Sequence, residues 1–410
     1  MELRLFPAME KINLVIWTGN ALTGGVDVWV KELRRCLKDS RYNIVTISDG
    51  NTFAGGEKVN IYIHSWDQCA RVLGRLSPAV VMPNWRHKLF GICAKLNKEG
   101  SRLSCLGACH ADSAEEYYGP LAWYESAISG FMAVSGGCAR TLAEYIPRRK
   151  NDIELVTYGI TVPAREDRQW APSPLKMVYF GRIEQKQKNV FDLAALAALL
   201  DDKGVDYSLD IIGSGPDKRE LASKFAGSKR VRLSGQVEHA ELMKMLRGYD
   251  VFVQVSSFEG QSVSMLEAMA TGVIPCVTRA SGGGWRIIED GRNGFTADVG
   301  DMEAMALAIK EISGMDMERA DTTGRAARRT VEDDFDITKN ISAFTKLADK
   351  CSKSAGRQWA HGDIYDMPGG WSLNYLPKNE IAGIAMKTAF RFMPRIRLRH
   401  LVHRLKKGAK

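Results

Sequence analysis

Residues 251–267 read V-F-V-Q-V-S-S-F-E-G-Q-S-V-S-M-L-E and contain two acids that are eight positions apart. The apolar run 251–255 predicts a short buried strand, and a glycine directly follows the first acid, Glu259. The pattern predicts a helix after this loop, with Glu267 one to two turns inside it. Both carboxylates can then face a ligand that lies over the helix N-terminus, where backbone N–H groups favour an anion.

The segments that follow extend the same pattern. Residues 268–272 end the predicted helix, 273–277 are typical of another buried strand, and 282–284 are three glycines. Two solvated acids after a strand would show the same spacing without any function. The stretch 256–301 as a whole resembles the nucleotide-sugar-binding region of the retaining glycosyltransferases of GT-B fold, glycosyltransferase family 4. The resemblance implies an α/β fold with two doubly wound, Rossmann-like domains that face each other across a cleft.

Two series of short apolar runs alternate with helical patterns, which is the rhythm of doubly wound α/β domains. The predicted strands are 12–17, 42–47, 59–64, 79–82, 131–135 and 153–156 in the first series, and 176–180, 207–212, 231–233, 251–253 and 273–276 in the second. Between the series, 158–163 and a polar stretch with Pro172 and Pro174 predict a linker, because proline suits neither strand nor helix interiors.

We therefore expect four parts in the chain. Residues 1–165 form a Rossmann-like domain on the acceptor side, and residues 175–335 form a Rossmann-like domain that binds the nucleotide sugar. Residues 336–353 contain a helix that, by the resemblance, returns to the N-terminal domain. Residues 354–410 form an irregular connector and a basic amphipathic tail. A ligand is expected in the cleft between the two domains.

Composition restricts the class of protein. The chain has 410 residues, 45% of them hydrophobic and 26% charged, which is typical of a soluble globular protein with two domains. No run of about 18 apolar residues predicts a transmembrane helix, and no secretory signal is expected. The eight cysteines predict reduced, buried thiols in a cytoplasmic protein. Cys105 and Cys109 beside His110 lack a fourth ligand, so no metal is expected.

Two basic residues follow the first predicted strand of the second domain. Residues 181–189 read G-R-I-E-Q-K-Q-K-N and resemble the segment with which the family embraces the donor diphosphate. The resemblance implies that Arg182 and Lys188 stabilise charge on the departing nucleoside diphosphate. A solvated basic loop is the alternative for this segment taken alone.

The resemblance also assigns the remaining donor contacts. Glu259 would hydrogen-bond sugar hydroxyls, Glu267 the ribose, and the backbone of 261–263 the phosphates. The full set of donor-binding candidates is Gly24, Gly25, Gly213, Val237, Gly260, Gln261, Ser262, Val263 and Glu267. Gly213 lies in a G-x-G-P turn that we expect to be mainly structural, and Gly24 and Gly25 suit a plain strand-to-helix turn equally well.

His110 and Asp112 follow the stretch 103–109 of the first domain. In the resembling family a histidine at this place lies beside the transferred sugar, often with an acid two positions later. A single histidine is more often a structural residue. The catalytic candidates are His110, Asp112, Arg182, Lys188 and Glu259.

The predicted function is retaining transfer of a sugar from a UDP- or GDP-sugar to a glycan or lipid-linked acceptor in cell-envelope polysaccharide or lipopolysaccharide synthesis. No cofactor is expected, because the nucleotide sugar is a substrate. Two alternatives stay open: a nucleotide-sugar epimerase of GT-B fold, and a non-catalytic protein that only binds nucleotide sugars. Residue types alone do not distinguish UDP from GDP.

The net charge of +9 is concentrated in the last thirty residues, which have nine Lys or Arg and no acid. The rest of the chain is close to neutral, so nucleic acid is not an expected partner. Residues 387–410 interleave apolar residues with cations, a pattern that suits an anionic membrane surface on the cytoplasmic side. A basic helix packed on the protein is the alternative.

Overall fold

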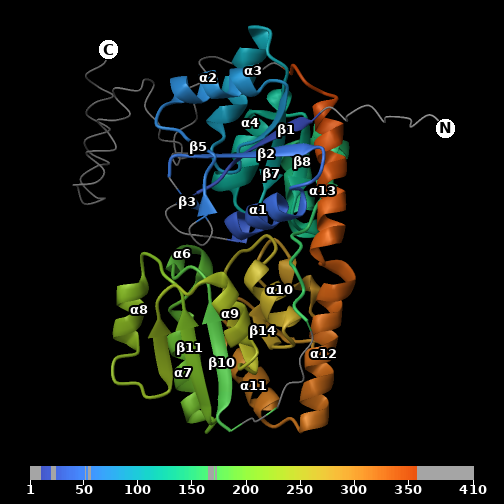
Figure 1. Ribbon diagram of the computed structural model, residues 1–410. Coiled ribbons are helices and arrows are strands. Elements are labelled where there is room, and N and C mark those ends of the chain that lie inside the picture. The colour runs from blue at the N-terminus through green and yellow to red at the C-terminus, as the bar shows by residue number, and fades with distance from the viewer. Residues whose placement is uncertain are drawn as a thin grey trace, which may run out of the picture.

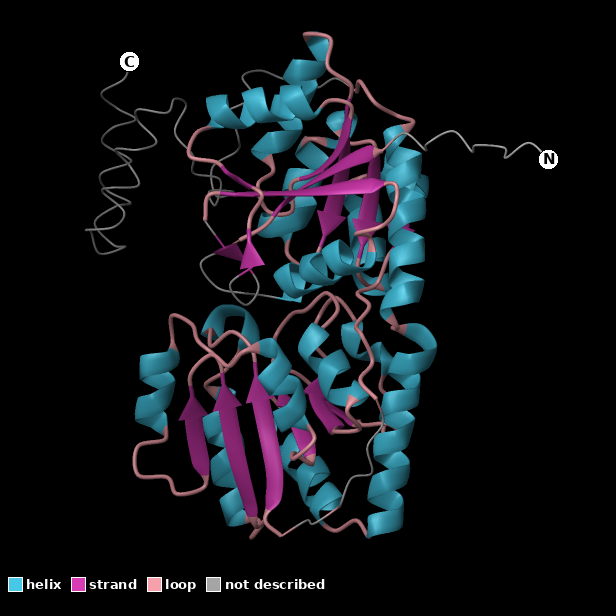
Figure 2. Ribbon diagram, viewed as in Figure 1, coloured by secondary structure: helices cyan, strands magenta, loops and turns pink. Residues whose placement is uncertain are grey.

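The computed structural model describes residues 11–19, 25–50, 52–53, 57–164, 170 and 173–357. These residues form two α/β domains stacked one above the other, with a long helical segment running down one side of both (Figure 1). In each domain helices cover a parallel sheet (Figure 2). Within the described ranges, no helix is both long and apolar enough to span a bilayer.

The N-terminal domain contains seven parallel strands in the order β5-β2-β1-β6-β7-β8-β9. The strands are β1 (Ile12–Trp17), β2 (Tyr42–Ser48), β5 (Ile61–Tyr62), β6 (Ala79–Met82), β7 (Leu103–Cys109), β8 (Gly130–Ala133) and β9 (Ile153–Leu155), and β3 (Thr52–Phe53) pairs separately with β4 (Glu57–Lys58). The helices are α1 (Gly25–Cys36), α2 (Trp66–Leu76), α3 (Lys88–Lys98), α4 (Gly119–Trp123) and α5 (Gly136–Tyr145), with a π-helical turn at Ala114–Tyr118 and 3-10 helices at Glu125–Ala127 and Pro147–Asp152.

The C-terminal domain contains six parallel strands in the order β12-β11-β10-β13-β14-β15. They are β10 (Leu175–Phe180), β11 (Tyr207–Ile212), β12 (Val231–Ser234), β13 (Val251–Gln254), β14 (Ile274–Thr278) and β15 (Phe295–Ala297). The helices are α6 (Gln185–Lys188), α7 (Asp192–Asp202), α8 (Lys218–Lys224), α9 (His239–Leu246), α10 (Val263–Ala270), α11 (Met302–Ser313) and α12 (Met317–Asp334), with a 3-10 helix at Gly284–Ile287. A last described helix, α13 (Ile337–Ser352), returns to the N-terminal domain.

Strand order places a crevice in each domain. Chain order reverses between β1 and β6 in the first sheet and between β10 and β13 in the second. At such a point the loops after two neighbouring strands run in opposite directions, which opens a crevice at the carboxyl ends of those strands. Ligands of doubly wound folds bind in this crevice. The loops after β10 and β13 carry Arg182, Lys188 and Glu259. Strand topology therefore brings these three residues to one edge of the sheet.

The two domains share part of their core. One hydrophobic cluster includes Leu14 of β1, Val178 of β10 and Phe344 of α13, whereas two further clusters lie within one domain each. Helix α13 packs on β7 and α1 of the N-terminal domain, and the Trp29 Nε1–H donates to Asn340 Oδ1 at 2.7 Å. Helix α13 thus returns from the C-terminal domain to the N-terminal domain.

The strand predictions are mostly confirmed, with some differences. Four strands were not predicted, namely β7 (Leu103–Cys109), β15 (Phe295–Ala297) and the short pair β3 and β4, and the expected strand 59–64 contains only the two residues Ile61–Tyr62. β7 reads L-S-C-L-G-A-C and is buried along its whole length. Small residues of modest β-propensity, buried on both faces, show neither alternation nor a β-branched run.

Candidate functional site at the domain junction

The loops after β10 and β13 meet through an ion pair. The Lys188 Nζ lies 2.6 Å from Glu259 Oε1, and both side chains are largely buried. The backbone holds these loops together, since Ser257 N–H donates to the Gln187 carbonyl at 2.9 Å. A buried ammonium and carboxylate at the carboxyl edge of a sheet can contact the charged and hydroxyl groups of a ligand.

Arg182 lies in the same loop and remains partly exposed. Its guanidinium donates to Gln187 Oε1 at 2.5 Å and lies 3.3 Å from the Glu184 carboxylate. Arg182 and Lys188 therefore supply two positive charges near Glu259. Together they can neutralise a diphosphate more fully than either could alone.

The loop before α10 presents further polar groups. Ser262 caps α10, because its Oγ accepts from the Met265 N–H at 3.2 Å and donates to Gln254 Oε1 at 2.5 Å. Gln261 is buried, and its Nε2 has no hydrogen-bond partner in the described part of the chain. A buried donor without a partner costs free energy, and an acceptor on a bound ligand would relieve that cost.

His110 lies at the carboxyl end of β7, and its protonation state follows from its neighbours. The Asn84 Nδ2 donates to the Trp17 carbonyl at 2.5 Å, so Asn84 Oδ1 is the acceptor for His110 Nε2–H at 2.8 Å. His110 Nδ1 must then accept from the Tyr158 hydroxyl. Burial lowers the pKa of His110 to about 3, so the ring is neutral. Both ring nitrogens are bonded within the protein.

Asp112 lies two residues further on and is also engaged. Its Oδ1 accepts from the Tyr118 hydroxyl at 2.5 Å, and its backbone N–H donates to the Glu259 carbonyl at 3.3 Å. Tyr118 belongs to the π-helical turn Ala114–Tyr118, a local irregularity often found at functional sites.

Glycines allow the two domains to approach closely at this point. Ala111 and Gly260 form an antiparallel bridge, and a Cβ on Gly260 would lie 2.2 Å from the His110 carbonyl oxygen. The Ser135 hydroxyl donates to the Gly282 carbonyl at 2.5 Å, and a Cβ on Gly137 would lie 2.1 Å from that same oxygen. Backbone contacts therefore place the segment 110–112 directly against the loop that carries Glu259.

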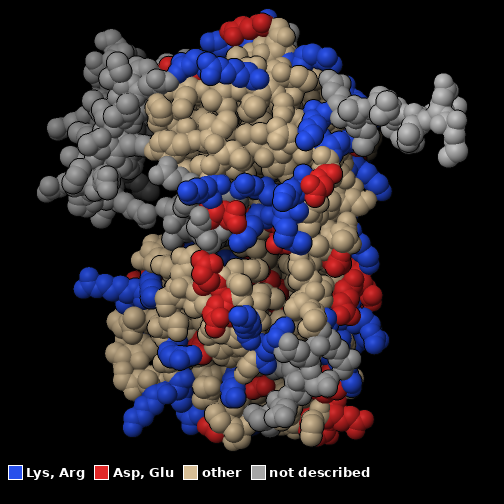
Figure 3. Space-filling view, in the orientation of Figure 1, with Lys and Arg blue, Asp and Glu red and all other residues tan. Residues whose placement is uncertain are grey.

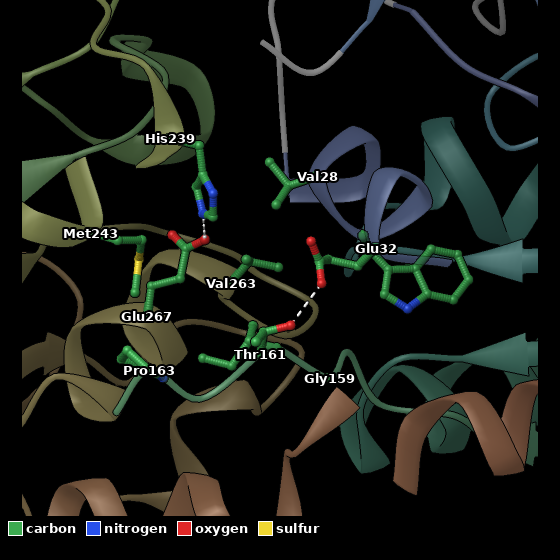
Figure 4. A pocket seen from close by; sticks show the side chains of 11 residues that line it. Val28, Glu32, Gly159, Thr161, Pro163, His239, Met243, Val263 and Glu267 are labelled. Carbon is green, nitrogen blue, oxygen red and sulfur yellow. Dashed lines mark hydrogen bonds and ion pairs between the residues drawn. The ribbon is translucent and has the colours of Figure 1, made fainter. Parts of the chain in front are cut away.

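Glu267 lies one turn into α10, as expected, and faces a pocket between the domains (Figure 4). Its Oε1 lies 2.6 Å from His239 Nε2, at the start of α9. The hydrogen bond to Glu267 raises the pKa of His239, and burial opposes that effect. The Glu267 side chain is itself 7% exposed.

Among the other predicted donor-binding residues, Gly25 and Gly213 lie where the packing leaves no room for a side chain. A Cβ on Gly25 would lie 2.9 Å from Val263 Cγ2, and one on Gly213 would lie 2.0 Å from the Gly181 carbonyl oxygen. Gly213 thereby lets β11 approach the loop that carries Arg182. Val237 is half-buried and packs on the shared core. Gly24 lies outside the described residues.

Sequence reasoning missed several residues that the fold brings to this site. Asn84 and Tyr158 fix the tautomer of His110, and Glu32 and His239 line the pocket beside Glu267. Asn84 could have been found, because it follows β6 at the switch point of the first sheet. Glu32 and His239 gave no such signal, since each lies on a helix that is far from Glu267 in the sequence.

Comparison with known proteins shows what the C-terminal domain is similar to. Residues 163–330 match the family Glycosyl transferases group 1, so this part of the chain is similar to the glycosyltransferase domains of that group. The glycogen synthase of Mycobacterium tuberculosis is 31% identical over 188 residues, which cover 45% of this chain and 44% of that protein. The phosphatidyl-myo-inositol mannosyltransferase of Mycolicibacterium smegmatis is 27% identical over 234 residues, 54% of this chain and 58% of that protein. The chain thus matches about half the length of these relatives.

A solved structure shares the fold over most of the chain. The structure of Anabaena HepE in complex with UDP and glucose has a TM-score of 0.66 and 14% identity, and it covers 82% of this chain and 99% of that one. The predicted fold class, two Rossmann-like domains facing each other in the GT-B arrangement, is confirmed.

Proposed function

We propose that this protein is a retaining glycosyltransferase that moves a sugar from a nucleoside-diphosphate sugar to a glycan or glycolipid acceptor. The observation that carries the proposal is the buried Lys188–Glu259 pair at the switch point of the glycosyltransferase domain, directly against the segment 110–112 of the other domain. In this proposal the C-terminal domain supplies positive charge for the diphosphate, and the segment 110–112 of the N-terminal domain closes over the sugar.

The donor would lie with its diphosphate between Arg182, Lys188 and the N-terminus of α10. Two cations and a helix N-terminus stabilise the charge that develops on the departing nucleoside diphosphate. Glu259 would accept hydrogen bonds from sugar hydroxyls, and Glu267 from the ribose. Because the side chains themselves supply the positive charge, we propose that transfer needs no metal ion.

In the proposed mechanism no side chain acts as a covalent nucleophile. The bond between the anomeric carbon and the phosphate oxygen breaks, and the acceptor oxygen attacks the anomeric carbon from the same face. The acceptor proton passes to an oxygen of the departing diphosphate. Glu259 is held by Lys188 and Asp112 by Tyr118, which suits binding and orientation. The neutral His110 would shape the wall beside the sugar.

The biological role that we propose is synthesis of a cell-envelope polysaccharide or lipopolysaccharide, on the cytoplasmic face of the membrane. The relatives named above act, by their names, on glycogen and on phosphatidyl-myo-inositol. A lipid-linked acceptor would suit the basic segment 387–410, which lies outside the described residues.

A donor panel tests the proposal. The protein is incubated with common UDP-, GDP- and ADP-sugars, and release of nucleoside diphosphate is measured with and without EDTA. We expect release from one nucleotide class, unaffected by EDTA, and retention of the anomeric configuration by NMR once an acceptor is found. Formation of an epimer without nucleotide release would indicate an epimerase, and binding without either reaction would indicate a non-catalytic protein.

A further inference from the structure

A pocket of about 200 Å³ lies between the two domains, with Val263 and Glu267 of α10 in its wall and α1 of the N-terminal domain facing them (Figure 4). The lining residues are Val28, Trp29, Glu32, Gly159, Ile160, Thr161, Pro163, His239, Met243, Val263 and Glu267. They come from α1, from the segment that links the domains, and from α9 and α10. Both domains therefore build this pocket.

Two carboxylates face the pocket from opposite walls, one from each domain (Figure 4). Each is anchored through one oxygen. Glu267 Oε1 bonds His239 at 2.6 Å, and Glu32 Oε2 accepts from Arg35 at 2.8 Å and from Thr161 at 2.7 Å. No hydrogen bond from the described residues reaches the second oxygen of either group. Each carboxylate thus keeps one acceptor atom for a ligand.

The charge state of Glu32 supports this role. The hydrogen bonds from Arg35 and Thr161 outweigh burial and lower the pKa of Glu32, so Glu32 is ionised at neutral pH. Besides its bond with Glu267, His239 feels two charges of α1: the Glu32 carboxylate raises its pKa and the Lys31 ammonium lowers it. On the face shown in Figure 3, Lys and Arg gather over α1 with acids among them, and Lys31 and Arg34 pair there with Glu57. The pocket carboxylates themselves are held by Arg35 and His239.

The size of the pocket restricts its occupant. Pockets that take a whole drug-sized ligand measure roughly 300–1,000 Å³, so this one suits a single ring. Apart from the two acids, the wall is mostly apolar, with Val28, Pro163, Met243 and Val263 among its members. A ribose ring has that combination, since its two adjacent hydroxyls donate hydrogen bonds and its C–H face packs on apolar carbon.

A donor whose diphosphate binds at the start of α10 would have its ribose in this pocket. The proposed diphosphate site is at the start of α10, and Glu267 follows Val263 by four residues, about 6 Å along the helix. Ribose is the next unit of the donor after the diphosphate. We propose that the ribose diol bridges Glu267 of the C-terminal domain and Glu32 of the N-terminal domain; this inference rests on the proposed function.

The bridge has a consequence for the reaction. Glu32 and Glu267 belong to different domains, so a bound ribose joins them and favours the closed arrangement in which the segment 110–112 meets Gly260. Glu32 is then a donor-binding residue of the N-terminal domain, and it acts through hydroxyl groups that UDP-, GDP- and ADP-sugars all carry.

The bridge is tested by removing the ribose hydroxyls and the Glu32 carboxylate separately and together. Binding of the better of UDP and GDP, and of its 2′-deoxy and 3′-deoxy analogues, is measured by calorimetry for the wild-type protein and for Glu32→Gln. Hydrogen bonds to charged groups contribute about 1.5–3 kcal/mol, so we expect Glu32→Gln to bind the ribonucleotide about 10-fold or more weakly. With the analogue that lacks the contacted hydroxyl, the two proteins should bind equally.

Glu57→Gln is the matched control, because Glu57 pairs with Lys31 and Arg34 of the same helix at 3.6 and 3.7 Å but does not line the pocket. An equal loss with all three nucleotides would assign Glu32 a structural role and overturn the bridge. Unchanged affinity of Glu32→Gln for the ribonucleotide would overturn it as well. If the wild-type protein bound none of the nucleotides, the proposed function itself would fail.

Discussion

At the scale of single residues, the Lys188–Glu259 pair is the best-defined chemical feature of this protein. Removing one member of a buried pair leaves an uncompensated charge, and loss of a charge contact to the transition state costs catalysis directly. We expect Lys188→Ala and Arg182→Ala to lower the rate of nucleotide release from the donor by a factor on the order of 100 or more.

Lys186→Ala is the control for this pair of variants. Lys186 lies on the same short helix but is exposed, and it pairs with the exposed Glu115 at 3.5 Å. Exposed pairs contribute little, so this variant should stay close to the wild-type rate. Wild-type rates for both Lys188→Ala and Arg182→Ala would show that the diphosphate does not bind here.

His110 allows a second prediction at this scale. Its ring is neutral and held by Asn84 and Tyr158, and we propose that it lies beside the transferred sugar. We expect His110→Ala to reduce sugar transfer more than it reduces binding of free nucleoside diphosphate. Tyr158→Phe, which keeps the ring but removes the bond to Nδ1, should have a smaller effect of the same kind. Equal losses of transfer and binding would place His110 in the nucleotide pocket or in the fold.

The bond between His239 and Glu267 makes part of the folding stability depend on pH. The pKa of His239 is raised in the folded protein, chiefly by Glu267, so the folded state holds the proton more tightly than the unfolded chain. The resulting stabilisation is complete below the ordinary histidine pKa of about 6.5 and disappears as pH rises through the raised value. The melting temperatures of the wild-type protein and His239→Asn should therefore differ most in acid and converge in base. A gap that stays constant with pH would contradict this.

At the scale of elements, contact between α5 and the loop around Gly282 tests whether closure matters. A Cβ on Gly137 would lie 2.1 Å from the Gly282 carbonyl oxygen, whereas one on Gly136 would meet only the Arg140 side chain at 3.6 Å. Both glycines start α5, so alanine at either position suits the helix. We expect Gly137→Ala to hold the domains apart and to lower transfer on the order of 100-fold.

Gly136→Ala should keep nearly the wild-type transfer rate and nucleotide affinity. Gly137→Ala should also bind nucleoside diphosphate more weakly, because separated domains cannot share the ribose between Glu32 and Glu267, and both variants should melt much as the wild-type protein does. Transfer assays, calorimetry and thermal unfolding separate these effects. Undiminished transfer by Gly137→Ala would mean that the reaction does not need this contact.

At the scale of the whole molecule, the basic segment 387–410 is the feature that would connect the proposed enzyme to a membrane-bound acceptor. Each Lys or Arg near an anionic surface contributes roughly 1 kcal/mol. We expect the full-length protein to co-sediment with anionic vesicles more than with neutral ones, and salt to weaken this binding. A chain that ends at Glu380 should lose the binding and keep nucleotide release. Indifference to the deletion would remove the membrane proposal and leave the transferase proposal intact.

Most of the strands, and the residues at the ends of β10 and β13, could be predicted from local patterns. Parallel strands buried on both faces leave apolar runs, and chemistry-bearing residues follow these runs at their carboxyl ends. For this reason Arg182, Lys188, Glu259 and Glu267 were found in the sequence.

Only the tertiary structure decided which groups face them. The tautomer of His110 depends on Asn84 and Tyr158, and the pocket beside Glu267 depends on Glu32 and His239. Those contacts join helices and loops far apart in the chain, and their partners are set by how the two domains pack, which no local periodicity encodes.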